Sequence, residues 1–159
     1  MRAWVIMLVL LTAAPTFAGT GVRGVMRADN KPLYITNGFE SGFDGWTASA
    51  SVTRTTDDSQ PAGGYSVRIP GGSSQYITKT FAHSEAVTIT FWHDFTGNGT
   101  FIWNVTYTGG SAGNIIGGSG SWGQVTLGPY PAGTTTLTLT YEGGAGYDIE
   151  VDTIRYPAP

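Results

Sequence analysis

NGFESGFDGW, residues 37–46, is the stretch of sequence that decides the fold of this chain. It sets one acidic residue, Glu40, beside apolar neighbours, marks two turns with glycines and ends on Trp46. Such a stretch is too broken for a helix and too aromatic for a linker, because glycine and asparagine favour turns while aromatic residues favour strands. We interpret it as the opening strand of a β-sandwich, and we expect Glu40 to meet Asp152 from the far end of the chain.

Short runs rich in β-branched and aromatic residues follow, separated by clusters of Gly, Pro, Asn and Ser. The predicted strands are 33–35, 50–55, 65–69, 74–81, 86–95, 100–108, 124–127, 134–141 and 147–156. Within 134–141, Leu137, Leu139 and Tyr141 alternate with threonines, as in a strand that buries one face. This pattern predicts an all-β domain, a sandwich of two antiparallel sheets with about eight to ten strands.

The N-terminal residues have the pattern of a secretory signal peptide, over residues 1–18. Arg2 gives a positive start, an apolar run follows, and small residues precede the cleavage point. The apolar run is shorter than the roughly 20 residues that span a bilayer. We therefore predict a secreted or cell-surface protein without a membrane span after cleavage. Residues 19–32 are predicted to be a flexible arm, and residues 33–157 to form the sandwich.

Composition supports an extracellular domain. The chain has 24 Gly, 8 Pro and only 12% charged residues, and it has no cysteine, which excludes disulfides, thiol chemistry and cysteine metal sites. The net charge is −3 at pH 7, and three of the basic residues, Arg23, Arg27 and Lys31, lie in the arm. The body of the protein is therefore acidic, which argues against a nucleic-acid partner.

Glu40 and Asp152 form the first candidate site. They stand near opposite ends of the domain, and the first and last strands of a sandwich commonly lie side by side. Two carboxylates brought together repel unless they share a proton or a cation, and Ca²⁺ is a hard ion that binds carboxylate and carbonyl oxygens. One hypothesis is a calcium site; the other is that each carboxylate faces solvent near a sheet edge.

Four short segments, taken in order, carry a family resemblance: NGFE with GW at 37–46, GYSVRI at 64–69, TITFW at 88–92 and IEVDTI at 149–154. Together they resemble the galactose-binding-like jelly-roll family, notably its carbohydrate-binding modules, over residues 35–156. The resemblance implies a jelly roll with a structural calcium held by Glu40 and Asp152, to which Asn37 could add a ligand. Thr153 stands where the family often has a second aspartate, so the chain departs from the family pattern there.

Aromatic residues are more numerous than a small sandwich core needs, with 5 Trp, 8 Tyr and 7 Phe. Ring faces pack on the apolar faces of sugars while polar groups bind the hydroxyls. The candidate glycan-binding residues are Trp92, Trp103, Tyr107, Trp122 and Gln124. Alternation turns Trp92 outward, and it turns Trp103 inward if Asn104 is outward. The alternative role of each ring is packing in the core or at a loop, which is the role expected of Trp46.

Catalytic patterns are weak, and we predict no catalytic residue and no enzyme. His83 and His93 are the only histidines, and neither has a recognisable nucleophile partner. Glu142, Asp148 and Glu150 could form a carboxylate pair, although charged residues near strand ends are usually solvated. Asn98 and Asn104 match the glycosylation pattern, and sugars there would occupy the strands proposed for binding.

Two functions from different classes fit these observations. The first is a noncatalytic carbohydrate-binding module that contacts a glycan or polysaccharide through exposed rings. The second is a structural subunit of a filament, pilus or surface layer, in which copies of the chain assemble through the N-terminal arm. Main-chain pairing of an arm with an open sheet edge would supply that contact, although glycines at 19, 21 and 24 weaken the arm as a strand.

Overall fold

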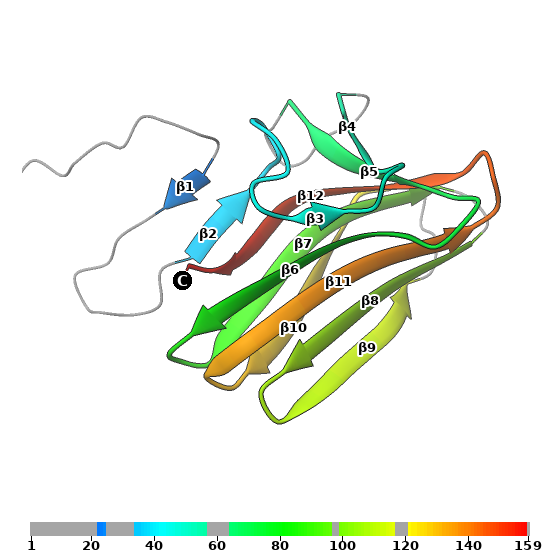
Figure 1. Ribbon diagram of the computed structural model, residues 1–159. Helices are drawn as coiled ribbons and strands as arrows, with labels where there is room; N and C mark the ends of the chain where they lie inside the picture. The colour runs from blue at the N-terminus through cyan, green and yellow to red at the C-terminus, as the bar shows by residue number, and fades with distance from the viewer. Residues whose placement is uncertain (1–21, 25–33, 57–63, 97–98, 117–120, 159) are drawn as a thin grey trace, which may run out of the picture.

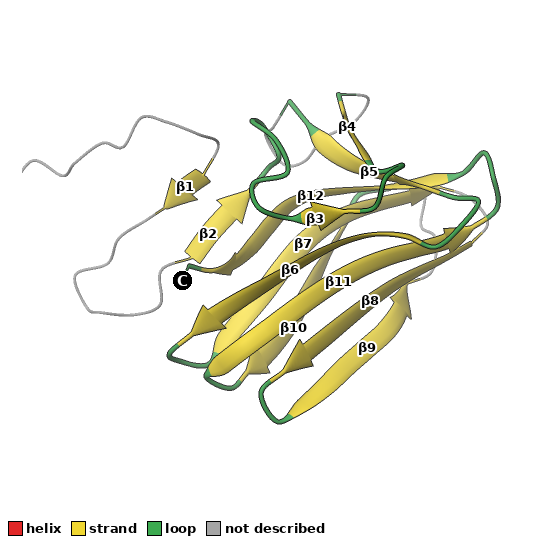
Figure 2. Ribbon diagram, in the orientation of Figure 1, coloured by secondary structure: helices red, strands yellow, loops and turns green. Residues whose placement is uncertain are grey.

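The computed structural model describes residues 22–24, 34–56, 64–96, 99–116 and 121–158. In this part of the chain every regular element is a strand and every strand pairing is antiparallel. Figure 1 and Figure 2 show the strands as two layers packed face to face. The predicted all-β sandwich is thereby confirmed. No helix of the described residues is long and apolar enough to cross a membrane.

Seven strands form the first sheet, sheet A. They are β1 (Val22–Gly24), β2 (Tyr34–Asn37), β4 (Thr53–Thr55), β5 (Ser66–Pro70), β7 (Val87–Thr96), β10 (Gly123–Tyr130) and β12 (Asp148–Pro157). Sheet B has five strands in the order β3-β6-β11-β8-β9. These are β3 (Thr47–Ala48), β6 (Gln75–His83), β8 (Gly99–Tyr107), β9 (Gly110–Ile116) and β11 (Gly133–Gly143).

The strand β12 holds sheet A together. Along one edge it pairs with β5 through Asp148–Val151 and then with β2 through Ile154–Pro157, while its other edge pairs with β7. The change of partner coincides with an irregularity at Thr153, whose φ is 48°. Such a bulge bends the strand so that one edge can serve two partners. The prediction that residues 37–46 form the opening strand is wrong: Asn37 ends strand β2, and residues 38–46 are bends and turns. The strand that precedes this stretch, β2, does pair with the closing strand β12.

The core lies between the two sheets, because apolar side chains alternate with polar ones along each strand and point to this side. Leu137, Leu139 and Tyr141 of β11 are completely buried, as the alternation predicts. Trp46 is buried as predicted, with its ring edge-on to Tyr156 at a centroid separation of 5.9 Å. Each buried large apolar side chain contributes about 1.5–3 kcal/mol relative to an exposed one. This burial fixes which face of every strand is left for solvent.

Most predicted strands shift by one or two residues at an end, and two of them differ in a way that has a physical reason or changes a strand's length. The run 50–55 contributes only Thr53–Thr55 to a strand, because Val52 donates its N–H to Ser49 in a turn (3.1 Å). The run 124–127 is extended to Gly123–Tyr130. Strands β3 and β9 were not predicted. The signal peptide and most of the arm lie outside the described residues, but Val22–Gly24 within the arm pairs with β2.

Candidate functional site

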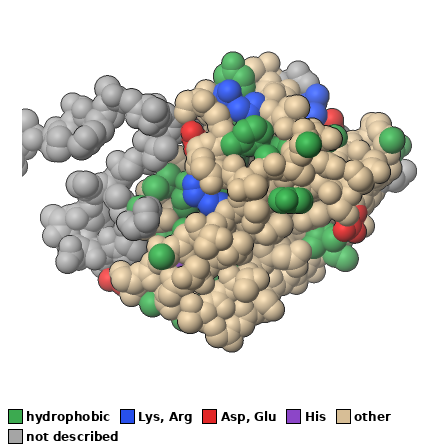
Figure 3. All heavy atoms as spheres, in the orientation of Figure 1, with side chains coloured by type: hydrophobic (Ala, Val, Ile, Leu, Met, Phe, Trp, Pro, Cys, Tyr) green, Lys and Arg blue, Asp and Glu red, His purple; other side chains and the backbone are tan. Residues whose placement is uncertain are grey.

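The outer face of sheet B carries mainly small side chains with hydroxyl groups. Strand register brings these side chains into rows across β6, β11 and β8, because directly paired residues point to the same side of a sheet. We term this surface the threonine face; it consists of Thr78, Thr80, Asn104, Thr106, Thr136, Thr138 and Thr140. All are partly or well exposed. Figure 3 views this side of the molecule and shows mostly uncharged polar side chains and backbone.

Hydroxyl groups on the threonine face are bonded to one another across the strands. Thr78 Oγ1 lies 2.8 Å from Thr138 Oγ1, and Thr80 Oγ1 lies 2.7 Å from Thr136 Oγ1. Cross-strand pairs of this kind stabilise a sheet by roughly 0.2–1 kcal/mol each. The hydroxyls are therefore held in fixed orientations, which favours the binding of a polar ligand with a regular repeat.

An aromatic ring and two isoleucines border the threonine face. Tyr76 is 38% exposed and pairs across β6 and β11 with Thr140, which in turn pairs with Ile102. Ile115 of the edge strand β9 pairs with Ile102 and is 63% exposed. A row running Tyr76, Thr140, Ile102 and Ile115 therefore combines a ring, a hydroxyl and two apolar side chains. These are the surface types that contact the apolar and polar sides of a sugar.

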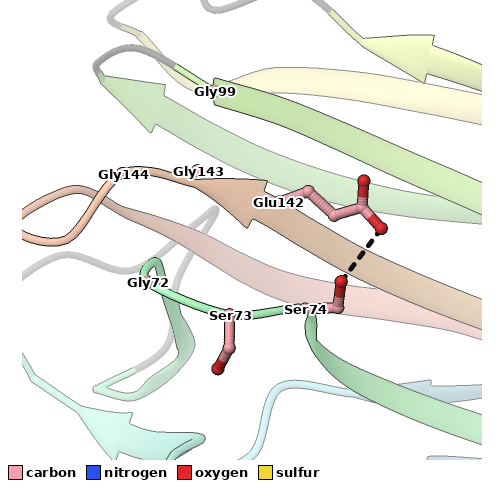
Figure 4. A pocket seen from close by; sticks show the side chains of 7 residues that line it. All are labelled: Gly72, Ser73, Ser74, Gly99, Glu142, Gly143 and Gly144. Atoms are coloured by element: carbon pink, nitrogen blue, oxygen red, sulfur yellow. Dashed lines mark hydrogen bonds between the residues drawn. The ribbon is translucent and has the colours of Figure 1, made fainter.

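A hollow of about 530 Å³ lies at the end of this face, between the β5–β6 connection, the end of β11 and the start of β8. Its lining consists of Gly72, Ser73, Ser74, Gly99, Glu142, Gly143 and Gly144. Figure 4 shows Ser74 and Glu142 pointing toward each other, and Ser74 Oγ donates to Glu142 Oε1 at 3.0 Å. Since Glu142 continues the outward series of Thr138 and Thr140 on β11, the hollow and the threonine face form one surface.

Backbone hydrogen bonds hold the walls of the hollow. Gly71 donates its N–H to the carbonyl of Tyr147 at 2.8 Å, and Gly72 donates to that of Gly143 at 2.7 Å. The two connections approach so closely that a Cβ on Gly71 would lie 2.3 Å from the carbonyl oxygen of Gly144. Glycine at position 71 is therefore required sterically, and the hollow keeps its shape without a ligand.

Comparison with known proteins addresses the fold. No family model matches the chain, and no curated protein matches its sequence. Solved structures do match. TmCBM61, solved in complex with β-1,4-galactotriose, is 18% identical with a TM-score of 0.65, over 76% of this chain and 94% of its own. The fold is the jelly roll of carbohydrate-binding modules.

Two further structures show the same fold. A family 16 carbohydrate-binding module is 18% identical with a TM-score of 0.55, over 71% of this chain and 91% of its own. The K3 adhesin domain of Lys-gingipain from Porphyromonas gingivalis is 16% identical with a TM-score of 0.54, over 76% of this chain and 95% of its own. At these identities the likeness concerns the fold and not the ligand.

The predicted glycan-binding residues fall into two groups in this jelly roll. Trp92 and Gln124 pair directly across β7 and β10, on the outer face of sheet A, with Gln124 well exposed and Trp92 partly exposed. Trp122 lies one residue before β10 and is partly buried, and its buried indole nitrogen has no hydrogen-bond partner among the described residues. The outward orientation predicted for Trp92 agrees with the complete burial of Phe91 beside it.

Trp103 and Tyr107 form the other group. They face the inner side of sheet B, because they pair with the buried residues Leu139 and Thr135 of β11. Both pack partly buried against the core, and the Tyr107 ring lies 4.9 Å from the ring of Tyr130. The structure thus separates these rings from Trp92 by the thickness of the sandwich.

Tyr76, Ser74 and Glu142 were not predicted as ligand-binding residues. Alternation within 74–81 places Tyr76 beside Thr78 and opposite Ile77, so the pattern could have indicated an exposed ring. Asn104, one of the two glycosylation candidates, is exposed on the threonine face. Asn98 lies outside the described residues.

The carboxylates of Glu40 and Asp152 approach the same space beside Gly38. A Cβ on Gly38 would lie 3.7 Å from Asp152 Oδ1 and 3.7 Å from Glu40 Oε1. Asp152 is completely buried and accepts the N–H of Thr153 (2.5 Å), and Glu40 Oε1 accepts the N–H of Gly64 (2.8 Å). Two carboxylates around such a space fit a hard cation completed by backbone carbonyls.

Asn37 takes a different position at this corner. It is completely buried; its Oδ1 accepts the N–H of Phe39 at 2.8 Å, and its Nδ2 has no hydrogen-bond partner in the part of the chain that the structure describes. In the described part of the chain, no group of three or more His, Cys, Asp and Glu side chains is arranged to hold a metal. A cation here would therefore depend on Glu40 and Asp152 and on main-chain oxygens.

The remaining titratable side chains have structural partners. His83 Nε2 lies 2.8 Å from Thr135 Oγ1, and its Nδ1 lies 2.8 Å from the carbonyl oxygen of Glu85. Arg68 bridges Asp148 (3.1 Å) and Glu150 (3.0 Å) on sheet A. One guanidinium therefore binds both of these carboxylates, and Glu142 lies on the other sheet.

Proposed function

We propose that this protein is a secreted, noncatalytic glycan-binding domain that holds its ligand on the threonine face. The observation that carries the proposal is the hollow of about 530 Å³ that continues this face, with Glu142 and Ser74 converging on it. Its volume is within the range of roughly 300–1,000 Å³ found for ligand sites. The signal-peptide pattern of residues 1–18 supports secretion.

In this proposal, each side chain of the surface contacts a different part of the sugar. The exposed Tyr76 ring offers a flat apolar surface for a sugar face. The Glu142 carboxylate accepts hydrogen bonds from sugar hydroxyls, and the Ser74 hydroxyl fixes its orientation. The threonine hydroxyls continue this polar surface along β11, which suits a chain of several sugar units.

The lining of the hollow supports a noncatalytic role. Glycoside hydrolysis generally needs two carboxyl groups on either side of the bond that breaks. Among the described residues Glu142 is the acidic side chain that lines the hollow, while Asp148 and Glu150 are bound to Arg68. The surface can therefore bind a sugar without a second carboxyl group to complete a hydrolytic pair.

Binding is tested by calorimetry with β-1,4-galactotriose, the ligand of TmCBM61, and then with a panel of neutral oligosaccharides. We expect Tyr76→Ala and Glu142→Gln each to weaken binding about tenfold, which corresponds to the loss of one ring contact or one charge-assisted hydrogen bond. Glu85→Gln, an exposed change in the β6–β7 turn, is the matched control. Unchanged affinity in both face variants would refute this location of the site.

We also propose that Glu40 and Asp152 hold a calcium ion with a structural role. Bound calcium would neutralise the two carboxylates and tie the opening stretch to β12. A ligand bound only by the native state raises stability, by about 2.7 kcal/mol at 100 times its Kd. We expect a chelator to lower the Tm of the wild type and to have no effect on Glu40→Gln. An unchanged wild-type Tm would contradict the site.

One observation favours a second function, that of a filament subunit. Strand β1, from the predicted arm, pairs with β2 of its own chain through Val22–Gly24. The arm of a neighbouring copy could take the same place by main-chain pairing. Electron microscopy of the purified protein tests this function, which requires fibres that disappear when residues 19–31 are deleted. A monomeric protein without fibres would exclude it.

A further inference from the structure

Trp92 is a partly exposed tryptophan on a sheet face that no other sheet covers. Its neighbours along β7, Phe91 and His93, point into the core and are almost fully buried, so Trp92 points outward from sheet A. It does not belong to the core cluster. Among the described residues its ring packs on no other ring and its indole N–H forms no hydrogen bond. A partly exposed ring of this size on an outer face is a common feature of ligand contacts.

Polar side chains surround this ring on the outer face of sheet A. Gln124 lies directly opposite Trp92 on β10, and Thr126 lies opposite Thr90 in the next outward row. Asp94 follows Trp92 by two residues and therefore faces the same side. We term the set Thr90, Trp92, Asp94, Gln124 and Thr126 the tryptophan face. Gln124 and Thr126 are well exposed, which leaves the β10 side of the ring open.

The chemistry of the tryptophan face fits a neutral sugar. A flat ring is flanked by an amide and two hydroxyls, which together can donate and accept hydrogen bonds around a sugar ring. On the adjoining strands, Asp152 pairs directly with Trp92 and is completely buried, and the exposed Arg155 pairs directly with Thr90. Arg68 binds Asp148 and Glu150. Charged groups of both signs therefore lie beside the tryptophan face.

The tryptophan face and the threonine face lie on opposite sides of the sandwich. Trp92 projects from the outer side of sheet A, and Tyr76 projects from the outer side of sheet B. The buried core residues separate them, so one sugar unit cannot contact both rings. Two separate ligand chains, or two distant parts of one chain, are needed to occupy both faces.

We propose that the tryptophan face is a second glycan-binding site and that the protein is bivalent. This inference rests on the proposed glycan-binding function but not on the same residues. A bivalent domain cross-links polysaccharide chains, and two weak sites on one domain raise the retention on an insoluble polymer by 10²-fold or more. The tryptophan face supplies stacking through Trp92 and orientation through Gln124.

Calorimetric stoichiometry tests the inference, with β-1,4-galactotriose as the first probe and the panel of neutral oligosaccharides after it. The wild type should bind two ligands per chain, Trp92→Thr one, Tyr76→Ala one, and the double variant none. Threonine suits an outward strand position, and an unchanged Tm shows that each variant is folded. Glu85→Gln should retain both sites.

The outcomes separate this inference from the proposed function. One ligand per wild-type chain, lost in Tyr76→Ala and kept in Trp92→Thr, overturns the second site and leaves the function standing. One ligand lost only in Trp92→Thr supports the tryptophan face and overturns the threonine face as the site. Absence of binding to every neutral glycan overturns both.

A spectroscopic measurement locates the second site directly. In the Tyr76→Ala background, the indole N–H resonance of Trp92, assigned from its loss in Trp92→Phe, should shift on addition of the oligosaccharide. Mixing the wild type with a soluble polysaccharide should also produce cross-linked aggregates, whereas either single-face variant should not. An indole resonance that does not respond to a saturating ligand overturns the assignment.

Discussion

Arg54 fixes the backbone of Phe39. Its Nε lies 2.6 Å from the Phe39 carbonyl oxygen, and its Nη2 lies 2.7 Å from the carbonyl oxygen of Glu40. Phe39 has a φ of 56°, a region that L-residues rarely adopt. The stretch that opens the fold is therefore held in an unusual conformation by a side chain from strand β4 rather than by pairing of its own.

Replacing Arg54 by Lys should destabilise the protein by about 1–3 kcal/mol. Lysine keeps the positive charge but lacks the planar group that binds two carbonyl oxygens at once. It also loses the stacking of the guanidinium on Tyr65, whose ring centroid lies 4.0 Å from the Arg54 Cζ. Urea denaturation measures the loss. Arg155→Lys is the matched control, since Arg155 is exposed and lies over Tyr34. Equal losses in the two variants would contradict a special role for Arg54.

Gly71→Ala should destabilise the β5–β6 and β11–β12 connections by about 1–3 kcal/mol, since the added methyl group would meet the main-chain oxygen of Gly144 at 2.3 Å. It should also weaken ligand binding at the hollow, because the same connections form its walls. Gly144→Ala is the control for stability, because its Cβ would meet only the Tyr147 ring at 3.8 Å. Thermal denaturation of both variants checks this prediction.

His93 should make the protein less stable in acid. Burial against Phe101, at a ring separation of 5.5 Å, lowers the pKa of His93 below its usual 6.5. At pH values between that lowered pKa and 6.5, the unfolded chain binds a proton at this histidine and the folded chain does not. The free energy of unfolding therefore decreases as the pH falls below 6.5.

The His93→Phe variant should lose this part of the pH dependence, because phenylalanine cannot be protonated and suits the apolar site. Free energies of unfolding at about pH 8 and about pH 5 give the comparison. A variant with the same acid slope as the wild type would assign the effect to other groups.

Tyr156 should make the protein less stable in alkali. Burial, with a smaller effect of Asp44, raises the pKa of Tyr156 from 10.0 to about 12. Above pH 10 the unfolded chain releases the phenolic proton first, so stability falls as the pH rises through this range. Lys79, whose Nζ lies 4.9 Å from the Tyr156 ring, has a pKa lowered chiefly by burial and acts in the opposite direction.

Tyr156→Phe isolates the tyrosine effect, since the phenylalanine ring keeps the stacking on Phe81. We expect a shallower loss of stability between pH 10 and about 12 than in the wild type. Denaturation by urea across this range checks it, and identical slopes would contradict the prediction.

Much of the fold could be predicted because it is encoded by alternation. Leu137, Leu139 and Tyr141 repeat with period two, and burial of that face follows from the pattern alone. Strand β9 was missed because Gly110–Ile116 has two glycines and only two β-branched residues, and its strand conformation depends on pairing with β8. Such context cannot be read from local propensity.

The candidate site was harder to predict, since its residues come from strands that are distant in sequence. Ser74 and Glu142 are 68 residues apart and meet only because β6 pairs with β11. Of the aromatic residues predicted to bind a glycan, Trp92 faces outward as predicted, but Trp103 and Tyr107 face the inner side of sheet B. Composition indicated that rings were in excess but could not show which of them reach solvent.

The position of β12 has a consequence for synthesis of the protein. Strands β2, β5 and β7 all pair with β12, although they precede it by more than fifty residues. On the ribosome these strands emerge without the partner that joins them, and non-local pairing of this kind is slow and exposes strand edges to aggregation. Sheet A can therefore close only after its final strand has left the exit tunnel.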